Sequence, residues 1–68
     1  MKIQPGSTVL VRAFPNQELR RRVVALESGV VLLTTDIEWR TSQAQQRDPV
    51  CLGFPIEDII EIIINAPS

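Results

Sequence analysis

Arginine side chains are the residues of this sequence best suited to chemistry with anions, and they gather near the N-terminus. Residues 1–26 carry five basic side chains against one acid, a balance of +4, whereas residues 27–68 carry seven acids against two arginines, a balance of −5. Guanidinium groups form paired hydrogen bonds with phosphate or carboxylate groups. The sequence therefore predicts contact with an anion such as a nucleic-acid backbone through Arg12, Arg20, Arg21 and Arg22.

The same arginines also have a structural interpretation. They can form a solvated face, or pair inside the protein with the acids Glu57, Asp58 and Glu61. The pI near 5.2 lies well below that of a dedicated nucleic-acid-binding domain, which favours the structural interpretation. Binding of a nucleic-acid backbone is therefore kept as the alternative function.

Residue types that support catalysis or metal binding are sparse. The chain has no histidine and one cysteine, Cys51, so the usual zinc ligands and a base for the thiol are missing, and we expect Cys51 to be buried in a strand. The acids at residues 57, 58 and 61 have no catalytic partner beside them. We therefore expect a protein that is not an enzyme and uses neither metal nor cofactor. An enzyme built around the central pore of an oligomer is a third alternative.

The length of 68 residues fits one domain, which we place at residues 8–64 between tails at residues 1–7 and 65–68. A domain of this size buries only about 60% of the surface of its unfolded chain, and one cysteine allows no internal disulfide, so association is the remaining source of stability. The single cysteine and the lack of a signal-peptide core predict a cytoplasmic protein. The longest apolar stretch is too short to span a bilayer, so no membrane partner is expected.

Short runs rich in Val and Ile, separated by turn residues, predict an all-β fold. Val and Ile together number fifteen against six leucines, and β-branched side chains favour a pleated, half-buried surface. The second run has apolar residues on both faces near Val23 and Val24, which predicts a strand that bends between two parts of a sheet. The expected strands cover residues 8–14, 19–27, 30–35, 50–54 and 59–64.

Two connections carry further local signals. A turn at residues 15–18 pairs Phe14 with Leu19, which places Arg12 opposite Arg21. Thr35 and Glu38 have the spacing of a capping box, whose two side chains satisfy the first amides of a helix. A short helix over residues 36–46 is therefore expected, although the polar run at residues 41–43 leaves an ordered loop as the alternative.

Five short strands, a bent second strand and a helical turn before the last strand resemble the SH3-like small barrel. The stretches at residues 30–39, 47–49 and 53–59 are also similar to those of short, uncharacterised bacterial proteins. The resemblance covers residues 8–64 and implies a five-stranded barrel, with the helix or ordered loop between strands three and four, but no functional residues. The chain has no tyrosine and one tryptophan, so it departs from SH3 domains that bind proline-rich peptides through an aromatic groove.

The charge split and the apolar last strand predict a small, non-catalytic protein-interaction module that associates with itself. A basic face of one copy would meet an acidic face of another. Trp39 either anchors a partner or caps the open end of the barrel. The last strand is either internal to the barrel or an interface strand. The candidate interface residues are Trp39, Ile60, Ile62 and Ile64.

Overall fold

Five antiparallel strands and one α-helix form the regular structure in a computed structural model that describes residues 3–65. This mostly β architecture confirms the expected order of elements, and every boundary lies within two residues of its expected place. Residues 1–2 and the expected C-terminal tail beyond residue 65 lie outside the described residues. The elements are β1 (Thr8–Ala13), β2 (Gln17–Glu27), β3 (Val30–Thr34), α1 (Asp36–Ala44), β4 (Leu52–Pro55), the 3-10 helix η1 (Ile56–Asp58) and β5 (Ile59–Ile64).

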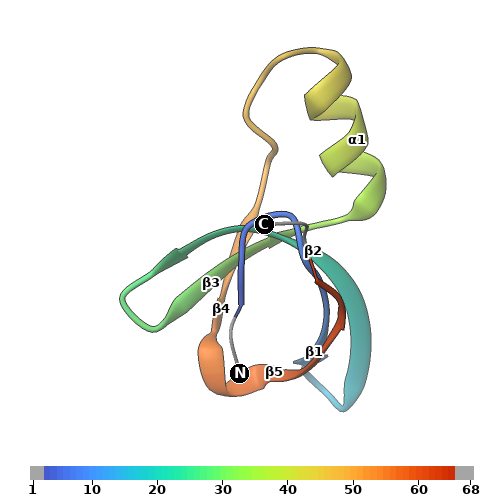
Figure 1. Cartoon of the computed structure of the whole chain (residues 1–68). Coiled ribbons are helices and arrows are strands. Elements are labelled where there is room, and N and C mark those ends of the chain that lie inside the picture. The colour runs from blue at the N-terminus through green and yellow to red at the C-terminus, as the bar shows by residue number, and fades with distance from the viewer. Residues whose placement is uncertain (1–2, 66–68) are drawn as a thin grey trace.

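The strands lie in one curled sheet in the order β4-β3-β2-β1-β5, with α1 standing outside it at one end (Figure 1). Among the described residues β4 and β5 do not pair with each other, so the sheet is not closed into the expected barrel. Two local irregularities occur in the strands at the two edges of the sheet. The ladder between β5 and β1 has two register irregularities. β4 has only four residues and ends at Pro55, which has no N–H to donate.

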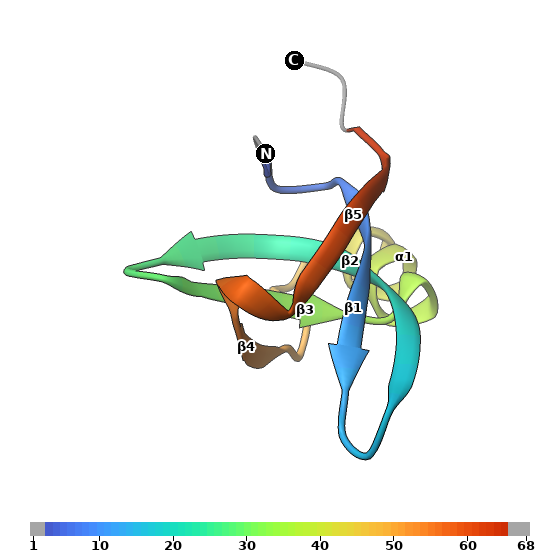
Figure 2. The ribbon, with the colours of Figure 1, turned by 90° about the horizontal axis from the view of Figure 1, so that it is seen from below.

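The predicted bend of the second strand is confirmed. β2 pairs with β1 through residues 17–22 and with β3 through residues 22–27. The ladder with β3 skips a residue between Val23 and Ala25, and such a bulge bends a strand. As a result, the hairpin of β1 with β2 and the hairpin of β2 with β3 extend in different directions (Figure 2).

The core lies on the inner face of this curled sheet. Alternate residues of β1, Val9 and Val11, have no exposed surface, as expected for a strand with one buried face. Residues 3–7 also lie against the sheet, because the Gly6 N–H donates to the Val23 carbonyl at 2.7 Å, and Ile3 packs on the core. The buried hydrophobic residues are Val9, Val11, Val23, Val31, Leu33 and Ile59.

The first hairpin has a different register from the expected one. Ala13 pairs with Gln17, so Arg12 lies opposite Glu18 and not opposite Arg21. The turn is tighter than predicted because the Asn16 N–H donates to the Ala13 carbonyl at 3.1 Å, and Asn16 has a positive φ of 143°. Asparagine is among the non-glycine residues most often found with a positive φ.

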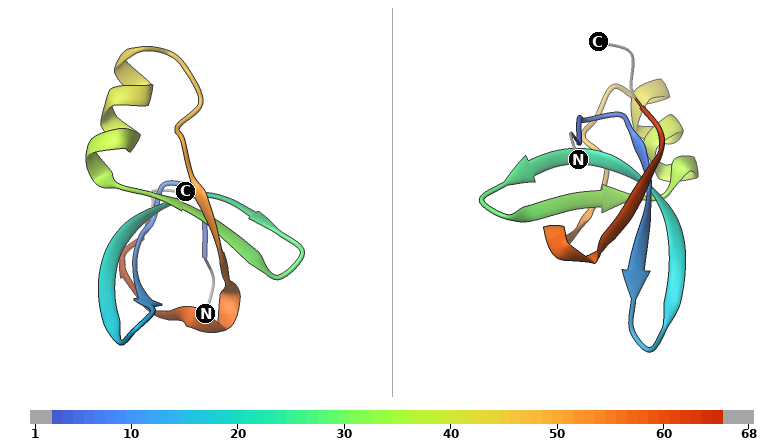
Figure 3. Two further views of the ribbon diagram at one scale, coloured as in Figure 1. Left: turned by 180° about the vertical axis from the view of Figure 1, so that it is seen from behind. Right: turned by 60° about the horizontal axis from the view of Figure 1, so that its bottom comes forward.

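The segment after β3 is a helix and not an ordered loop. Thr35 caps α1, since its hydroxyl oxygen accepts a hydrogen bond from the Glu38 N–H at 3.1 Å. The helix ends two residues earlier than predicted because Gln46 takes a positive φ of 53°. The N–H groups of Gln46 and Arg47 then bond back to the carbonyls of Gln43 and Ser42, which is the Schellman arrangement. α1 and the segment that returns to β4 project together beyond the sheet (Figure 3).

Candidate functional site

Asp36, in the first turn of α1, joins two arginines from different elements. Its Oδ1 accepts hydrogen bonds from Arg22 Nη2 at 2.6 Å and Nε at 3.2 Å, and its Oδ2 lies 2.7 Å from Arg40 Nη2. The hydrogen bond from Arg22 lowers the pKa of Asp36, and the charge of Arg40 acts in the same direction against the opposing effect of desolvation. One carboxylate therefore orients two guanidinium groups.

Arg22 makes two further contacts besides those with Asp36. Its Nη1 donates to the Gly6 carbonyl at 3.0 Å, and its Cζ lies 5.3 Å from the centre of the Trp39 ring. This distance is within the range of a cation–π contact. Since the Arg22 side chain is only 25% exposed, it is a fixed part of the structure that ties β2 to α1 and to the N-terminal segment.

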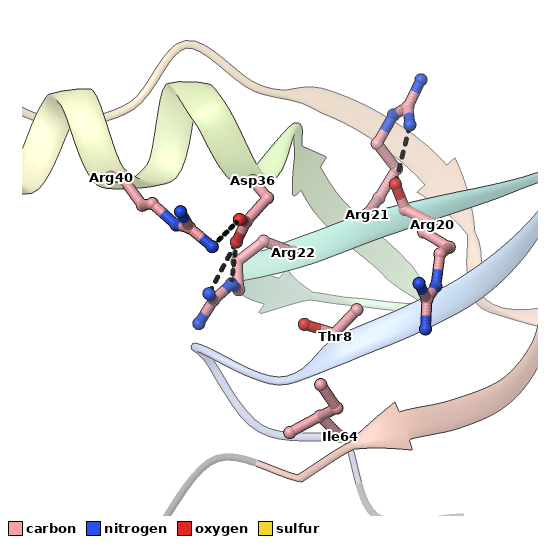
Figure 4. A pocket seen from close by; sticks show the side chains of 7 residues that line it. All are labelled: Thr8, Arg20, Arg21, Arg22, Asp36, Arg40 and Ile64. Atoms are coloured by element: carbon pink, nitrogen blue, oxygen red, sulfur yellow. Dashed lines mark hydrogen bonds and ion pairs between the residues drawn. The ribbon is translucent and has the colours of Figure 1, made fainter.

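A small pocket opens beside this arrangement (Figure 4). Arg22 and Arg40 lie on one side of it and Arg20 lies on the other, with Thr8 and Ile64 between them. The guanidinium of Arg21 points away from that of Arg20. We call this hollow of about 230 Å³ the arginine pocket, and its lining residues are Thr8, Arg20, Arg21, Arg22, Asp36, Arg40 and Ile64.

The structure changes the predicted arginine set in two ways. Arg12 does not line the arginine pocket and instead lies near the tip of the first hairpin, in a separate hollow with Asp58. Arg40, which was not in the predicted set, contributes the third guanidinium of the pocket. The i,i+4 spacing of Asp36 and Arg40 on a predicted helix was the signal that could have identified Arg40.

One of the two structural interpretations of the arginines, pairing with the acids at residues 57, 58 and 61, is not seen among residues 3–65. Among the described residues the salt bridges join Arg22 and Arg40 to Asp36, and Arg47 to Glu38. None of them uses the acids at residues 57, 58 and 61, and the basic residues Arg12, Arg20 and Arg21 have no carboxylate partner in this part of the chain. The pocket therefore keeps an excess of positive charge.

Glu38 makes a second connection of α1, this time to the segment that precedes β4. Its Oε2 accepts hydrogen bonds from Arg47 Nη1 at 2.6 Å and from the Val50 N–H at 2.9 Å. The hydrogen bond from Arg47, followed by that from Val50, lowers the pKa of Glu38 to about 2. The Glu38 carboxylate thus holds the returning segment, whereas the capping box would have directed it back to Thr35.

Beyond this connection lies a mainly apolar hollow of about 460 Å³ over β2, β3 and β4, which we call the apolar groove. Leu33 forms part of its floor and is 2% exposed, whereas Val50 and Leu52 at its rim are 75% and 70% exposed. Cys51, expected to be buried, is half-buried and also lines the groove. The lining residues are Leu19, Arg21, Leu33, Thr34, Thr35, Glu38, Val50, Cys51, Leu52 and Phe54.

The predicted interface residues are not brought together. Ile62 pairs with the buried Val9 and packs on the core, whereas Ile64 pairs with Thr8 and is 60% exposed. Val9 and Thr8 are neighbours whose side chains point to opposite faces, so Ile62 and Ile64 do not share a face. Ile60 is half-buried at a register irregularity, and the half-buried Trp39 lies beneath Arg22 on α1.

Within residues 3–65 no three His, Cys, Asp or Glu side chains come together as metal ligands would. In the same residues, no helix has the length and apolar character needed to cross a membrane. Comparison of the chain with models of protein families, with curated proteins and with solved structures found no match. The geometry of the arginine pocket and the apolar groove is therefore the basis on which a function can be inferred.

Proposed function

We propose that this chain is a small, non-catalytic interaction module that associates with itself through the apolar groove and the open edge of β4. The observation that carries the proposal is the exposed apolar rim formed by Val50 and Leu52. These residues belong to an uncharged stretch, residues 49–56, at the edge of the sheet. Exposed apolar surface beside a groove is typical of protein contacts.

The main chain of β4 is suited to pairing with another strand. The Ile56 N–H donates to the Gly29 carbonyl at 3.0 Å, so the alternation of an antiparallel ladder directs the main-chain groups of Gly53 away from β3. These N–H and C=O groups are then available to a strand added at the edge. Two copies related by a twofold axis near Gly53 would each contribute the same edge and the same rim.

A second copy is the occupant that the size of the domain favours. Six hydrophobic side chains are buried among the described residues, which is a small core for a chain without a disulfide. Covering the rim residues of two copies at once adds buried apolar surface to both.

The strand order and the helical turn before β5 also support a relation to SH3-like barrels, with the gap between β4 and β5 left open.

Sedimentation velocity over a concentration series tests the proposal with a matched pair of variants. We expect the parent chain to form dimers and Leu52→Asp to be a monomer, because an unpaired charge cannot be covered by an apolar partner surface. Ile37→Asp is the control, since Ile37 is 79% exposed on α1 and does not line the groove. A parent chain that stays monomeric at high micromolar concentration would contradict the proposal, as would equal effects of both variants.

The second candidate function is binding of a nucleic-acid backbone through the arginines of β1 and β2. The observation that favours it is that Arg12 and Arg20 have no carboxylate partner among the described residues. Backbone contacts release counterions, so affinity for a single-stranded oligonucleotide would fall steeply with salt. Arg12→Gln and Arg20→Gln would then each weaken binding and reduce that salt dependence.

A further inference from the structure

We propose that the arginine pocket binds a terminal phosphate group, a phosphomonoester carried by a small molecule. The inference shares Arg20 with the second candidate function and is independent of the apolar groove. Its first support is charge: Arg20, Arg22 and Arg40 contribute three positive charges and Asp36 one negative charge, which leaves a formal +2. A phosphomonoester carries about −1.5 to −2 at pH 7, so it matches this excess, whereas an internal phosphodiester carries one negative charge.

The second support is the supply of unused hydrogen-bond donors on both sides of the pocket. A guanidinium has five N–H donors, and Arg22 uses three of them for Asp36 and Gly6. The side chain of Arg20 makes no hydrogen bond or salt bridge to another described residue, so its donors are available. The Thr8 hydroxyl lies between the two sides (Figure 4). It also makes no side-chain hydrogen bond to another described residue.

The third support is that two of the three guanidinium groups are already oriented. Asp36 binds Arg22 and Arg40 through different carboxylate oxygens, at 2.6 Å and 2.7 Å. Contacts with Gly6 and Trp39 restrict Arg22 further. Ordering a long side chain costs entropy on binding, and here part of that cost is met during folding. Asp36 is therefore a positioning residue, and Arg20, Arg40 and Thr8 are the contacts expected for the ligand.

The size and shape of the pocket favour a terminal group over a track along a polymer. Its volume of about 230 Å³ is below the usual range for enclosing a whole small ligand, so it suits an anionic head group. Ile64 supplies an apolar wall for the carbon atoms that carry the phosphate. Arg12, which a backbone track would need, lies in another hollow near the hairpin tip.

The absence of histidine makes the pH dependence of binding a specific test. The charged groups that face the pocket are Arg20, Arg22, Arg40 and Asp36. Arg21 lines it with its guanidinium directed away, and Glu61 lies across β1 from Arg20. Histidine, the side chain whose ordinary pKa lies between pH 5.5 and 7.5, does not occur in the chain. A change of affinity in that interval would therefore report the second ionisation of the phosphate, near pH 6.

The experiment is a titration of the full chain with phenyl phosphate, followed by NMR chemical shifts and repeated from pH 5.5 to 7.5. We expect saturable binding that strengthens with pH, while sulfate, a dianion over the whole range, gives a flat profile. Arg20→Gln and Arg40→Gln should each weaken phenyl phosphate binding about tenfold, as expected for loss of charged hydrogen bonds. Arg12→Gln, the control, should leave it unchanged.

Several results would overturn the proposal. These are no saturable binding of phenyl phosphate, a flat pH profile for it, or an equal loss in Arg12→Gln and Arg20→Gln. An oligonucleotide without terminal phosphate that binds more tightly than phenyl phosphate, and loses affinity in Arg12→Gln, would overturn it in favour of the backbone function. Binding of phenyl phosphate but not of that oligonucleotide would support the proposal and reject the backbone function.

Discussion

The arginine pocket and the apolar groove lie on two sides of one helix, and each depends on a carboxylate in its first turn. Asp36 faces the pocket and is shared by two arginines, whereas Glu38 faces the groove and binds one arginine and one main-chain N–H. Because two arginines share the single charge of Asp36, the pocket keeps an excess of positive charge. The charges of Glu38 and Arg47, in contrast, neutralise each other. A carboxylate group thus orients arginines for an anion at one surface and holds the wall of the apolar groove at the other.

The largest expected difference is in the free energy of unfolding, between a substitution in the floor of the groove and one at its rim. Leu33 and Leu52 pair across β3 and β4, but Leu33 is 2% exposed and Leu52 is 70% exposed. Leu33→Ala should lower the free energy of unfolding by about 2–5 kcal/mol because it leaves a cavity in the core. Leu52→Ala should change it by less than about 0.5 kcal/mol, as is usual for an exposed site.

Urea denaturation at low protein concentration, followed by circular dichroism, measures both values. The low concentration keeps association from adding to the stability of the parent chain. Equal losses in the two variants would mean that the rim is buried within the single chain, and the distinction between floor and rim would be wrong.

A smaller change in stability should distinguish Arg22, which its contacts hold in place, from Arg20, whose side chain has no partner among the described residues. Arg22→Lys should destabilise the fold by about 1 kcal/mol, because one ammonium cannot bond both Asp36 and the Gly6 carbonyl while lying over Trp39. Arg20→Lys keeps the charge of a side chain that has no hydrogen-bond or ion-pair partner within residues 3–65, so thermal unfolding should be unchanged. If Arg20→Lys lowered the melting temperature as much as Arg22→Lys, the assignment of Arg20 to ligand contact would lose its basis.

Much of the fold follows from local signals in the sequence. The β-branched runs define the strands, and Thr35 caps α1 because its hydroxyl reaches the Glu38 N–H, a contact between residues three apart. The bend of β2 was readable from apolar residues on both faces at Val23 and Val24. Each of these features is decided by residues close in the chain, where spacing carries the information.

Features that depend on distant contacts were not predictable in the same way. The register of the first hairpin depends on the backbone of Asn16, and a change of turn moves Arg12 to a new partner. Closure of the barrel depends on how β4 and β5 meet, which no local pattern specifies. Arg22 was identified as an anion-binding candidate, but its partner lies fourteen residues away, and the arrival of α1 beside β2 determines that pair.

The acid sensitivity of the fold tests the roles of the two carboxylates in the first turn of α1. The folded-state pKa of Glu38 is about 2, against an ordinary value of 4.5, so its contribution to stability is present above the ordinary value and is lost as pH falls toward 2. The lowered pKa of Asp36 acts in the same direction. Glu38→Gln should therefore flatten part of the fall in stability between about pH 5 and pH 2.

Glu57→Gln is the control, since no salt bridge to Glu57 occurs among the described residues. Urea midpoints at several pH values measure the comparison. The effect should be small and should shrink in 1 M salt, because both partners of the Glu38–Arg47 pair are partly exposed. A Glu38→Gln profile that matches that of the parent chain would show that this pair does not hold the wall of the groove.

The smallest and most direct readout is the reactivity of Cys51, which lines the groove and not the pocket. If a second copy covers the groove, the rate of thiol modification by a disulfide reagent should fall to about half when half of the chains are paired. Leu52→Asp should abolish this dependence on protein concentration, whereas saturating phenyl phosphate should not affect the rate. A rate that responds to phenyl phosphate would mean that α1 transmits occupancy of the pocket to the groove, so the two surfaces could no longer be treated as independent.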